Sequence, residues 1–188
     1  MLRLLISRPF SDSELAPWVA PQESVVASRF APARRSEWLS WRALVRQTLG
    51  SDSLTFSYAP SGAPLIDGSP LCLSVSHCRG SIVVALSDVP CAVDIETLDR
   101  PFSRLASRYL APDEALLSDS PLWPAVAWCA KECLYKFSGL QGLDFLHDLS
   151  IRHVDFNTRT LSACVLGADP ALTLRFFFLA GRVIVFSS

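Results

Sequence analysis

The spacing of apolar residues along the chain constrains its fold more than any other feature of the sequence. The spacing of about 3.6 residues that marks an amphipathic helix covers 34–49, 101–118 and 121–139. Short apolar runs typical of strands cover 71–76, 81–87, 91–96, 149–156, 161–167, 172–180 and 182–187. Because strands and helices occur in separate groups rather than in strict alternation, the pattern predicts an α+β fold.

The order of these elements suggests that one kind of unit occurs twice. A strand, a helix and strands precede Val89, and helices followed by strands come after it. We therefore expect two similar α+β halves, an N-terminal half over 1–89 and a C-terminal half over 90–188. An edge strand and a loop are expected in roughly the first 25 residues, and a turn-rich loop over 58–70. A meander is expected from the runs 71–76, 81–87 and 91–96.

Composition narrows the class of protein. Half of the residues are hydrophobic and 19% are charged, without a repetitive polar stretch, which is typical of a globular chain. The net charge of −1 argues against a general nucleic-acid binder, which needs a basic surplus. No membrane span is expected, because Arg175 and Arg182 interrupt the most apolar segment, 174–186. Arg8 and Pro9 end the N-terminal apolar stretch too early for a signal peptide.

The cysteines indicate a reducing compartment. All six lack a CxxC pair and a secretory context, so we expect free thiols in a cytoplasmic protein. Cys129 and Cys133 lie one helical turn apart and are a minor alternative as part of a metal site. Zinc sites usually combine tighter pairs with further Cys or His ligands.

Two carboxylates stand two residues apart in the run CAVDIE. On a strand, Asp94 and Glu96 point to the same face while Val93 and Ile95 enter the core. Neighbouring carboxylates repel unless water screens them or a cation lies between them, and hard oxygen ligands suit Mg²⁺. The pattern fits either an exposed strand face or a magnesium site.

The expected helix 121–139 carries a third carboxylate. Glu132 and Lys136 are four residues apart, in the order that favours a surface ion pair. Trp128 shares their face, and Lys131 adds a second cation beside Glu132. His77, between two strands, suits either a turn in which its side chain bonds the backbone or a phosphate ligand.

Arginines form a stripe on the expected helix 34–49. Arg35, Arg42 and Arg46 line up within a narrow sector when successive residues turn by about 100°. Trp38 and Trp41 fall on another side. The stripe fits either a solvated helix face or a surface that binds phosphate.

Three separate blocks together resemble the surfactin-type 4'-phosphopantetheinyl transferases. That family has a Ser-His-(Ser/Cys) turn, an Asp-Ile-Glu strand and a helix with Trp-x-x-Lys-Glu-x-x-x-Lys. The blocks here lie in SVSHCRGSIVVALSDVPCAVDIE and WCAKECLYK, and they appear in the same order. The matching positions are Ser76-His77-Cys78, Asp94-Ile95-Glu96, Trp128, Lys131, Glu132 and Lys136.

The resemblance implies an activity and an architecture. Such an enzyme transfers the phosphopantetheine arm of coenzyme A to a serine of an apo acyl or peptidyl carrier protein and releases 3',5'-adenosine bisphosphate. It implies two similar halves related by a pseudo-two-fold axis, with the active site in the cleft between them. With both halves in one chain, the protein is expected to work as a monomer. The resemblance leaves open whether fatty-acid, polyketide or nonribosomal-peptide synthesis is served.

The resemblance also implies roles for the matching residues. Asp94, Glu96 and Glu132 are expected to hold Mg²⁺, which neutralises the pyrophosphate. Glu132 is expected to accept the serine proton. Lys131 and Lys136 are expected to act on the phosphates as catalytic groups. His77, with Ser76, is expected to bind coenzyme A.

Coenzyme A recognition departs from the family pattern at two places. The family often has a Gly-Lys-Pro-like loop and a Leu-x-Gly-Arg helix, where this chain has Gly62-Ala63-Pro64 and Leu39-Ser40-Trp41-Arg42. The cluster of Arg34, Arg35 and Arg42 is therefore expected to bind the 3'-phosphate. A catalytically silent module that binds carrier proteins is the alternative function, and loss of a carboxylate would mark it. No P-loop or kinase-like pattern supports another phosphoryl-transfer enzyme.

Overall fold

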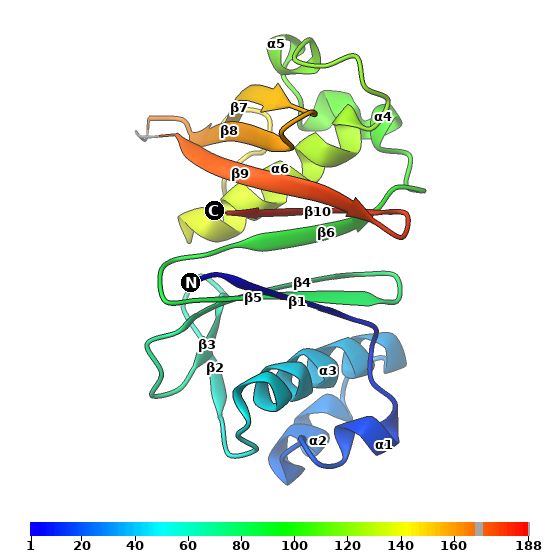
Figure 1. Ribbon diagram of the computed structural model, residues 1–188, viewed down its shortest axis with the longest axis vertical. Coiled ribbons are helices and arrows are strands. Elements are labelled where there is room, and N and C mark those ends of the chain that lie inside the picture. The colour runs from blue at the N-terminus through cyan, green and yellow to red at the C-terminus, as the bar shows by residue number, and fades with distance from the viewer. Residues whose placement is uncertain (168–170, 188) are drawn as a thin grey trace. The chain divides into compact units, whose positions relative to one another are not determined.

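Residues 1–167 and 171–187 are described by the computed structural model. Within them the strands form three antiparallel sheets, and helices accompany the sheets, which confirms the predicted α+β class. The residues divide into two units, Met1–Val89 and Pro90–Ser188. Figure 1 shows the helices and strands of each unit.

The sheet of the N-terminal unit has the order β1-β5-β4. Every residue of the central strand β5 is buried, which suits its uninterrupted apolar sequence SIVVALS. The turn between β4 and β5 uses Gly80 at a φ of 69°, a left-handed conformation that favours glycine. The strands span Arg3–Ser7 (β1), Cys72–Cys78 (β4) and Ser81–Ser87 (β5).

Helix α3 (Pro32–Leu49) organises the rest of this unit. Its residues Trp41 and Val45 pack into the core with β4 and β5, while Trp38 and Leu39 pack with the preceding short helices. Those helices are α1 (Asp12–Leu15) and α2 (Pro21–Ala27), in a region that the sequence predicted as loop. A small hairpin lies in the other predicted loop and pairs β2 (Phe56–Tyr58) with β3 (Pro64–Ile66).

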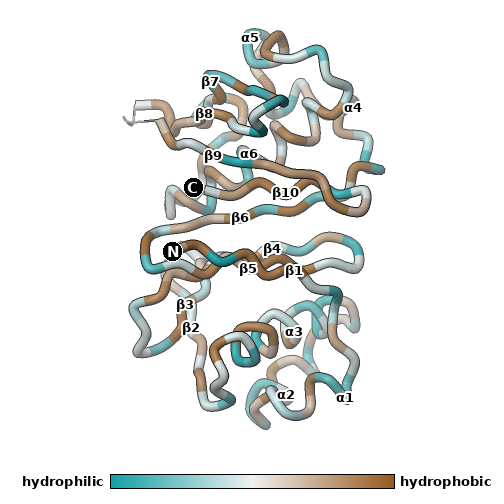
Figure 2. Tube along the Cα trace, in the orientation of Figure 1, coloured by the Kyte–Doolittle hydropathy of each residue, from teal (hydrophilic) through white to brown (hydrophobic). Residues whose placement is uncertain are grey.

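The sheet of the C-terminal unit has five strands in the order β6-β10-β9-β8-β7. Strand β10 is brown over most of its length in Figure 2. The strands span Val93–Thr97 (β6), Leu149–Asp155 (β7), Thr160–Val165 (β8), Leu172–Leu179 (β9) and Arg182–Ser187 (β10).

Helix α6 (Trp123–Ser138) covers one face of this sheet. Its residues Val126, Ala130 and Cys133 are fully buried and pack with Val183 and Val185 of β10. Smaller helical segments complete the unit: α4 (Phe102–Leu105), η1 (Ala106–Arg108) and α5 (Pro112–Ala115).

Two further predictions about elements were wrong. The strand expected to complete a meander is β6, which pairs with β10 at the far end of the chain and belongs to another sheet than β5. The expected helix 101–118 is broken, because Pro112 disfavours a helical conformation of the residue before it, and Ala111 is extended at φ −66° and ψ 157°.

Along the described ranges, no helix is both long enough and apolar enough to cross a membrane.

Candidate active site

Two rows of side chains face each other between β6 and α6. Asp94 and Glu96 share one side of the strand, and Trp128, Glu132 and Lys136 recur every four residues on one side of the helix. Lys136 Nζ donates to Asp94 Oδ1 at 2.7 Å, and Trp128 Nε1 donates to Glu96 Oε1 at 3.0 Å. These two bonds fix the register of helix and strand, with Glu132 one turn from each bonded residue of α6.

Asp94 is buried rather than part of an exposed strand face. Only 4% of the residue is accessible, and it is paired across the sheet with Val185, which belongs to the core under α6. Lys136 also donates to the carbonyl of Val93 at 3.2 Å. Burial by itself lowers the pKa of Lys136, but the Asp94 carboxylate, and to a lesser extent Glu132, outweighs burial and raises it. Lys136 therefore stays charged.

The Glu132 carboxyl group has a raised pKa, which suits it to proton transfer near neutral pH. Burial raises its pKa to about 7, and the negative charge of Asp94 adds to the effect. The positive charges of Lys136 and Arg100 lower the pKa and offset part of the rise. A carboxyl group with a pKa near 7 exchanges its proton close to neutral pH, as a general base must.

Glu96 accepts hydrogen bonds from two elements. Besides Trp128, Nη1 of Arg100 forms an ion pair with Glu96 Oε1, four residues further along the chain. The Arg100 guanidinium also lies 5.0 Å from the ring centroid of Phe102. The sequence analysis did not single out Arg100, because a spacing of four residues indicates an ion pair only on a helix, whereas Glu96 lies on β6 and Arg100 in the loop after it.

The carboxylates suit a divalent cation in chemistry but are not gathered around one position. Among the described residues, no three His, Cys, Asp or Glu side chains converge as a set of metal ligands. Oxygens of Glu96 and Asp94 are bonded to Arg100 and Lys136 instead. The three carboxylates nevertheless fit Mg²⁺ in chemistry: burial is the main cause of the raised pKa of Glu132, the negative charges of Asp94 and Glu96 add to it, and a cation would relieve that repulsion. Cys129 and Cys133 are part of the core.

Lys131 is not brought to this cluster. The side chain is fully buried, and Nζ donates to Glu114 Oε2 at 2.7 Å and to the carbonyls of Phe145 and Leu149 at 2.8 and 2.7 Å. Glu114 Oε1 in turn accepts from the backbone N–H of Ile151 at 2.7 Å. Lys131 therefore fastens α6 to α5 and β7. Glu114 was missed because its sequence neighbourhood carries no sign of burial.

His77 lies on β4 rather than in a turn. Its Nδ1 is 3.1 Å from Glu37 Oε2, and its Nε2 is 2.9 Å from Arg34 Nη1. Both partners come from α3, so this helix brings a cation and a carboxylate to the imidazole. Ser76 is buried, on the opposite side of the strand from His77, and is not part of this group.

Arg42 and Arg46 are buried, so neither a solvated face nor a phosphate surface describes the whole arginine stripe. Arg42 lies 3.3 Å from the ring centroid of Trp38, donates to Tyr58 Oη at 3.0 Å and pairs with Glu23 at 3.3 Å between Nε and Oε1. Arg46 Nη1 pairs with Glu23 Oε2 at 2.6 Å. The two guanidinium groups share the half-buried carboxylate of Glu23, which the sequence analysis missed because it lies on a helix that was not predicted.

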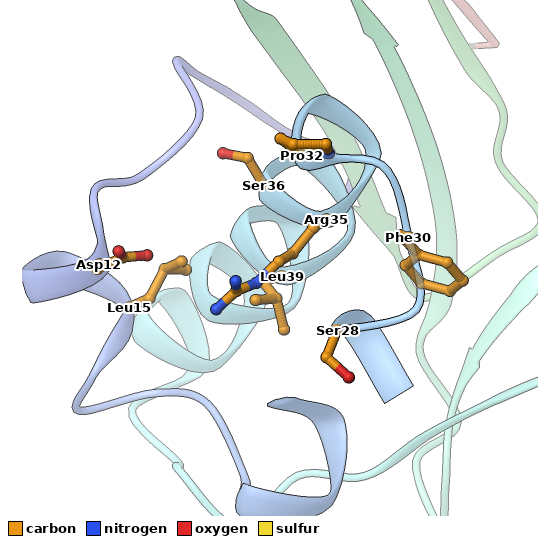
Figure 3. A pocket seen from close by; sticks show the side chains of 8 residues that line it. All are labelled: Asp12, Leu15, Ser28, Phe30, Pro32, Arg35, Ser36 and Leu39. Atoms are coloured by element: carbon orange, nitrogen blue, oxygen red, sulfur yellow. The ribbon is translucent and has the colours of Figure 1, made fainter. Parts of the chain in front are cut away.

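Arg35, in contrast, is exposed and lines a pocket of about 390 Å³. Figure 3 shows its side chain extending from α3 into this pocket, with Asp12 and Leu15 of α1 on one side and Ser28 and Phe30 on the other. The pocket belongs wholly to the N-terminal unit. The pocket thus offers an exposed cation beside hydroxyl and apolar groups, which suit an organic anion, together with the carboxylate of Asp12.

Comparison with known proteins assigns a family to the C-terminal unit. Residues 90–182 match the model of the family ACPS, 4'-phosphopantetheinyl transferase superfamily. The match contains Asp94, Glu96, Glu132 and Lys136. It begins at residue 90, so His77 lies outside it. No curated protein shows significant similarity to the chain.

Proposed function

We propose that this chain, whose residues 90–182 form an ACPS domain of the 4'-phosphopantetheinyl transferase superfamily, transfers the phosphopantetheine arm of coenzyme A to a serine of an apo carrier protein. The observation that carries the proposal is the pairing of β6 with α6, which brings Asp94, Glu96 and Glu132 to one side of the matched domain. Silent binding of carrier proteins would need none of these carboxylates.

Glu132 is the proposed proton acceptor. The serine oxygen forms a bond to the phosphorus on the pantetheine side of the pyrophosphate, and the P–O bond to 3',5'-adenosine bisphosphate breaks. The serine proton passes to Glu132, directly or through a water. The pKa of about 7 supports this role, because an ordinary glutamate is a weaker base at neutral pH.

Lys136 and the metal are proposed to balance the charge of the pyrophosphate. Asp94, Glu96 and Glu132 would hold Mg²⁺, which when bound neutralises phosphate charge. Lys136 is held in its charged form beside Asp94, so it can attract phosphate oxygens. Lys131 is left out of the catalytic set, because its ammonium group is fully buried among other partners.

Coenzyme A is proposed to bind through residues of the N-terminal unit. His77 and Arg34 form one basic group, and Arg35, in its pocket, is proposed to bind the 3'-phosphate. Arg42 and Ser76 are left out of these contacts, because both are buried.

The surfactin type is the finer part of the proposal. In that type one chain supplies two similar halves and works as a monomer. Support comes from the N-terminal unit, because His77 and Arg34 lie outside the matched range and yet are residue types that bind phosphate. Fatty-acid, polyketide and nonribosomal-peptide synthesis are the pathways that such an enzyme serves.

A panel of apo carrier proteins tests the function. Each carrier is incubated with the purified protein, coenzyme A and Mg²⁺, and its intact mass is measured. We expect at least one carrier to gain the mass of one phosphopantetheine, and the gain to disappear when its acceptor serine is replaced by alanine. Unchanged masses across fatty-acid, polyketide and peptide carriers would contradict the proposal.

A further inference from the structure

One carboxylate oxygen of Glu96 accepts hydrogen bonds from two side chains, one neutral and one positively charged. Trp128 Nε1 donates from α6, and Arg100 Nη1 pairs with the same Oε1 from the loop that follows β6. Because Oε1 accepts from both donors, its two lone pairs are taken, so a metal ion that binds Glu96 through this oxygen must displace one of them.

The two donors differ in how firmly they are held. The Trp128 ring packs edge-on against Tyr109 and at a tilt against Phe145, with 5.1 and 5.4 Å between ring centroids. The Arg100 side chain, in contrast, is 46% exposed, and its guanidinium lies over the ring of Phe102. Arg100 can therefore turn into solvent without opening the core, whereas Trp128 cannot.

The charge of Arg100 serves the whole cluster of carboxylates. It acts on Glu132 as well as on Glu96, and Asp94 acts on it in return. A divalent cation at the same carboxylates would supply this compensation more strongly and would repel the guanidinium.

We infer that Arg100 is a displaceable counter-ion that holds Glu96 in the metal-free protein and competes with a divalent cation for it. This inference rests on the proposed function, because that function assigns Asp94, Glu96 and Glu132 to the metal. Arg100 thereby sets the affinity for the cation and leaves Glu96 when the cation binds.

Manganese titration tests this competition directly. Free Mn²⁺ is followed by its electron paramagnetic resonance signal during titration of the full chain and of Arg100→Ala. Loss of an exposed ion partner should tighten Mn²⁺ binding roughly two- to fivefold at low salt, and less at high salt. Arg104→Ala removes an equal charge from an exposed position on α4 and should leave the affinity unchanged. Arg100→Gln retains much of the side-chain volume and should behave like Arg100→Ala.

A double substitution separates competition from a general charge effect. In Glu96→Gln the guanidinium has lost its hydrogen-bonded anionic partner and keeps only its longer-range effect on Asp94 and Glu132, so adding Arg100→Ala should bring a smaller gain in Mn²⁺ affinity than it does in the unsubstituted chain. Unchanged or weaker binding by Arg100→Ala, an equal gain in Arg104→Ala, or no Mn²⁺ binding by any variant would overturn the inference. The proposed transferase activity is judged separately, by the mass of carrier proteins treated with the unsubstituted chain.

Discussion

Lys131 and Lys136 lie five residues apart on the same helix and have different surroundings. The Lys131 ammonium group is buried and bonded to Glu114 and two backbone carbonyls. Burial lowers the pKa of Lys131, and the Glu114 carboxylate offsets part of this change. Lys136 is partly accessible beside Asp94. The same contrast separates Arg42, which is buried, from Arg35, which lines a pocket. Surroundings, more than residue type, therefore decide which cations can meet a ligand.

The raised pKa of Glu132 predicts a pH dependence of stability. The folded protein keeps a proton that the unfolded chain loses above pH 4.5, until Glu132 itself ionises near pH 7. Stability should therefore fall as pH rises from about 4.5 to 7, by roughly 2 kcal/mol after allowance for partial exposure. In Glu132→Gln this part of the decline should be absent, which urea unfolding between pH 4 and pH 8 measures. A parallel decline in both proteins would contradict the assignment.

Replacement of Arg35 should weaken substrate binding, whereas replacement of Arg42 should lower the stability of the fold. Arg35→Ala should raise the KM for coenzyme A roughly tenfold and hardly change that for 3'-dephospho-coenzyme A, because the charge-assisted bond needs the 3'-phosphate. Arg42→Ala should instead lower the free energy of unfolding by roughly 3 kcal/mol, since it breaks a buried ion pair. Steady-state kinetics and urea unfolding distinguish them, with exposed Arg29→Ala as the control. Equal KM increases for both coenzymes would refute the role of Arg35.

Helix α6 is the element on which the proposed site depends. Its polar side meets β6 through Lys136 and Trp128, while Lys131 anchors it from another side to α5 and β7. The position of Glu132 is therefore set by contacts on both sides of the helix.

Breaking the Lys131 anchor tests this dependence. Lys131→Met keeps the length of the side chain but leaves Glu114 buried without its cation, so the free energy of unfolding should fall by roughly 3–5 kcal/mol. Adding Glu114→Gln should recover part of the loss, because the uncompensated charge is removed. Thermal or urea unfolding measures both variants. A loss below about 1 kcal/mol in Lys131→Met would show that the pair is not an anchor.

The elements could be predicted where their signal is local. Periodicity found α3 and α6 and the strands β4, β5 and β10, and spacing found the shared sides of β6 and α6. Partners that are distant in sequence could not be found this way. The pairing of β6 with β10, the Glu23 partner of two arginines and the Glu114 partner of Lys131 all depend on tertiary contacts. Pro112, in contrast, was a local signal that should have divided the expected helix 101–118.

At the scale of the whole molecule, the matched family domain and the residues proposed to bind coenzyme A lie in different units. The match covers 90–182, whereas His77, Arg34 and the Arg35 pocket belong to Met1–Val89. The proposed division assigns the metal and the proton acceptor to the C-terminal unit and coenzyme A to the N-terminal unit. The proposal therefore expects transfer to require residues of both units.

The most direct test of this account is the rate at which an apo carrier protein gains phosphopantetheine mass, measured with coenzyme A and Mg²⁺ for the unsubstituted chain, Asp94→Ala and Glu132→Ala. Asp119→Ala, which removes an exposed carboxylate of the same unit, is the control. We predict transfer by the unsubstituted chain and by Asp119→Ala, and loss of at least a hundredfold in rate for the other two, since removal of a general base typically costs about 10² to 10⁴. Near-normal transfer by Asp94→Ala or Glu132→Ala at saturating Mg²⁺ would contradict the account.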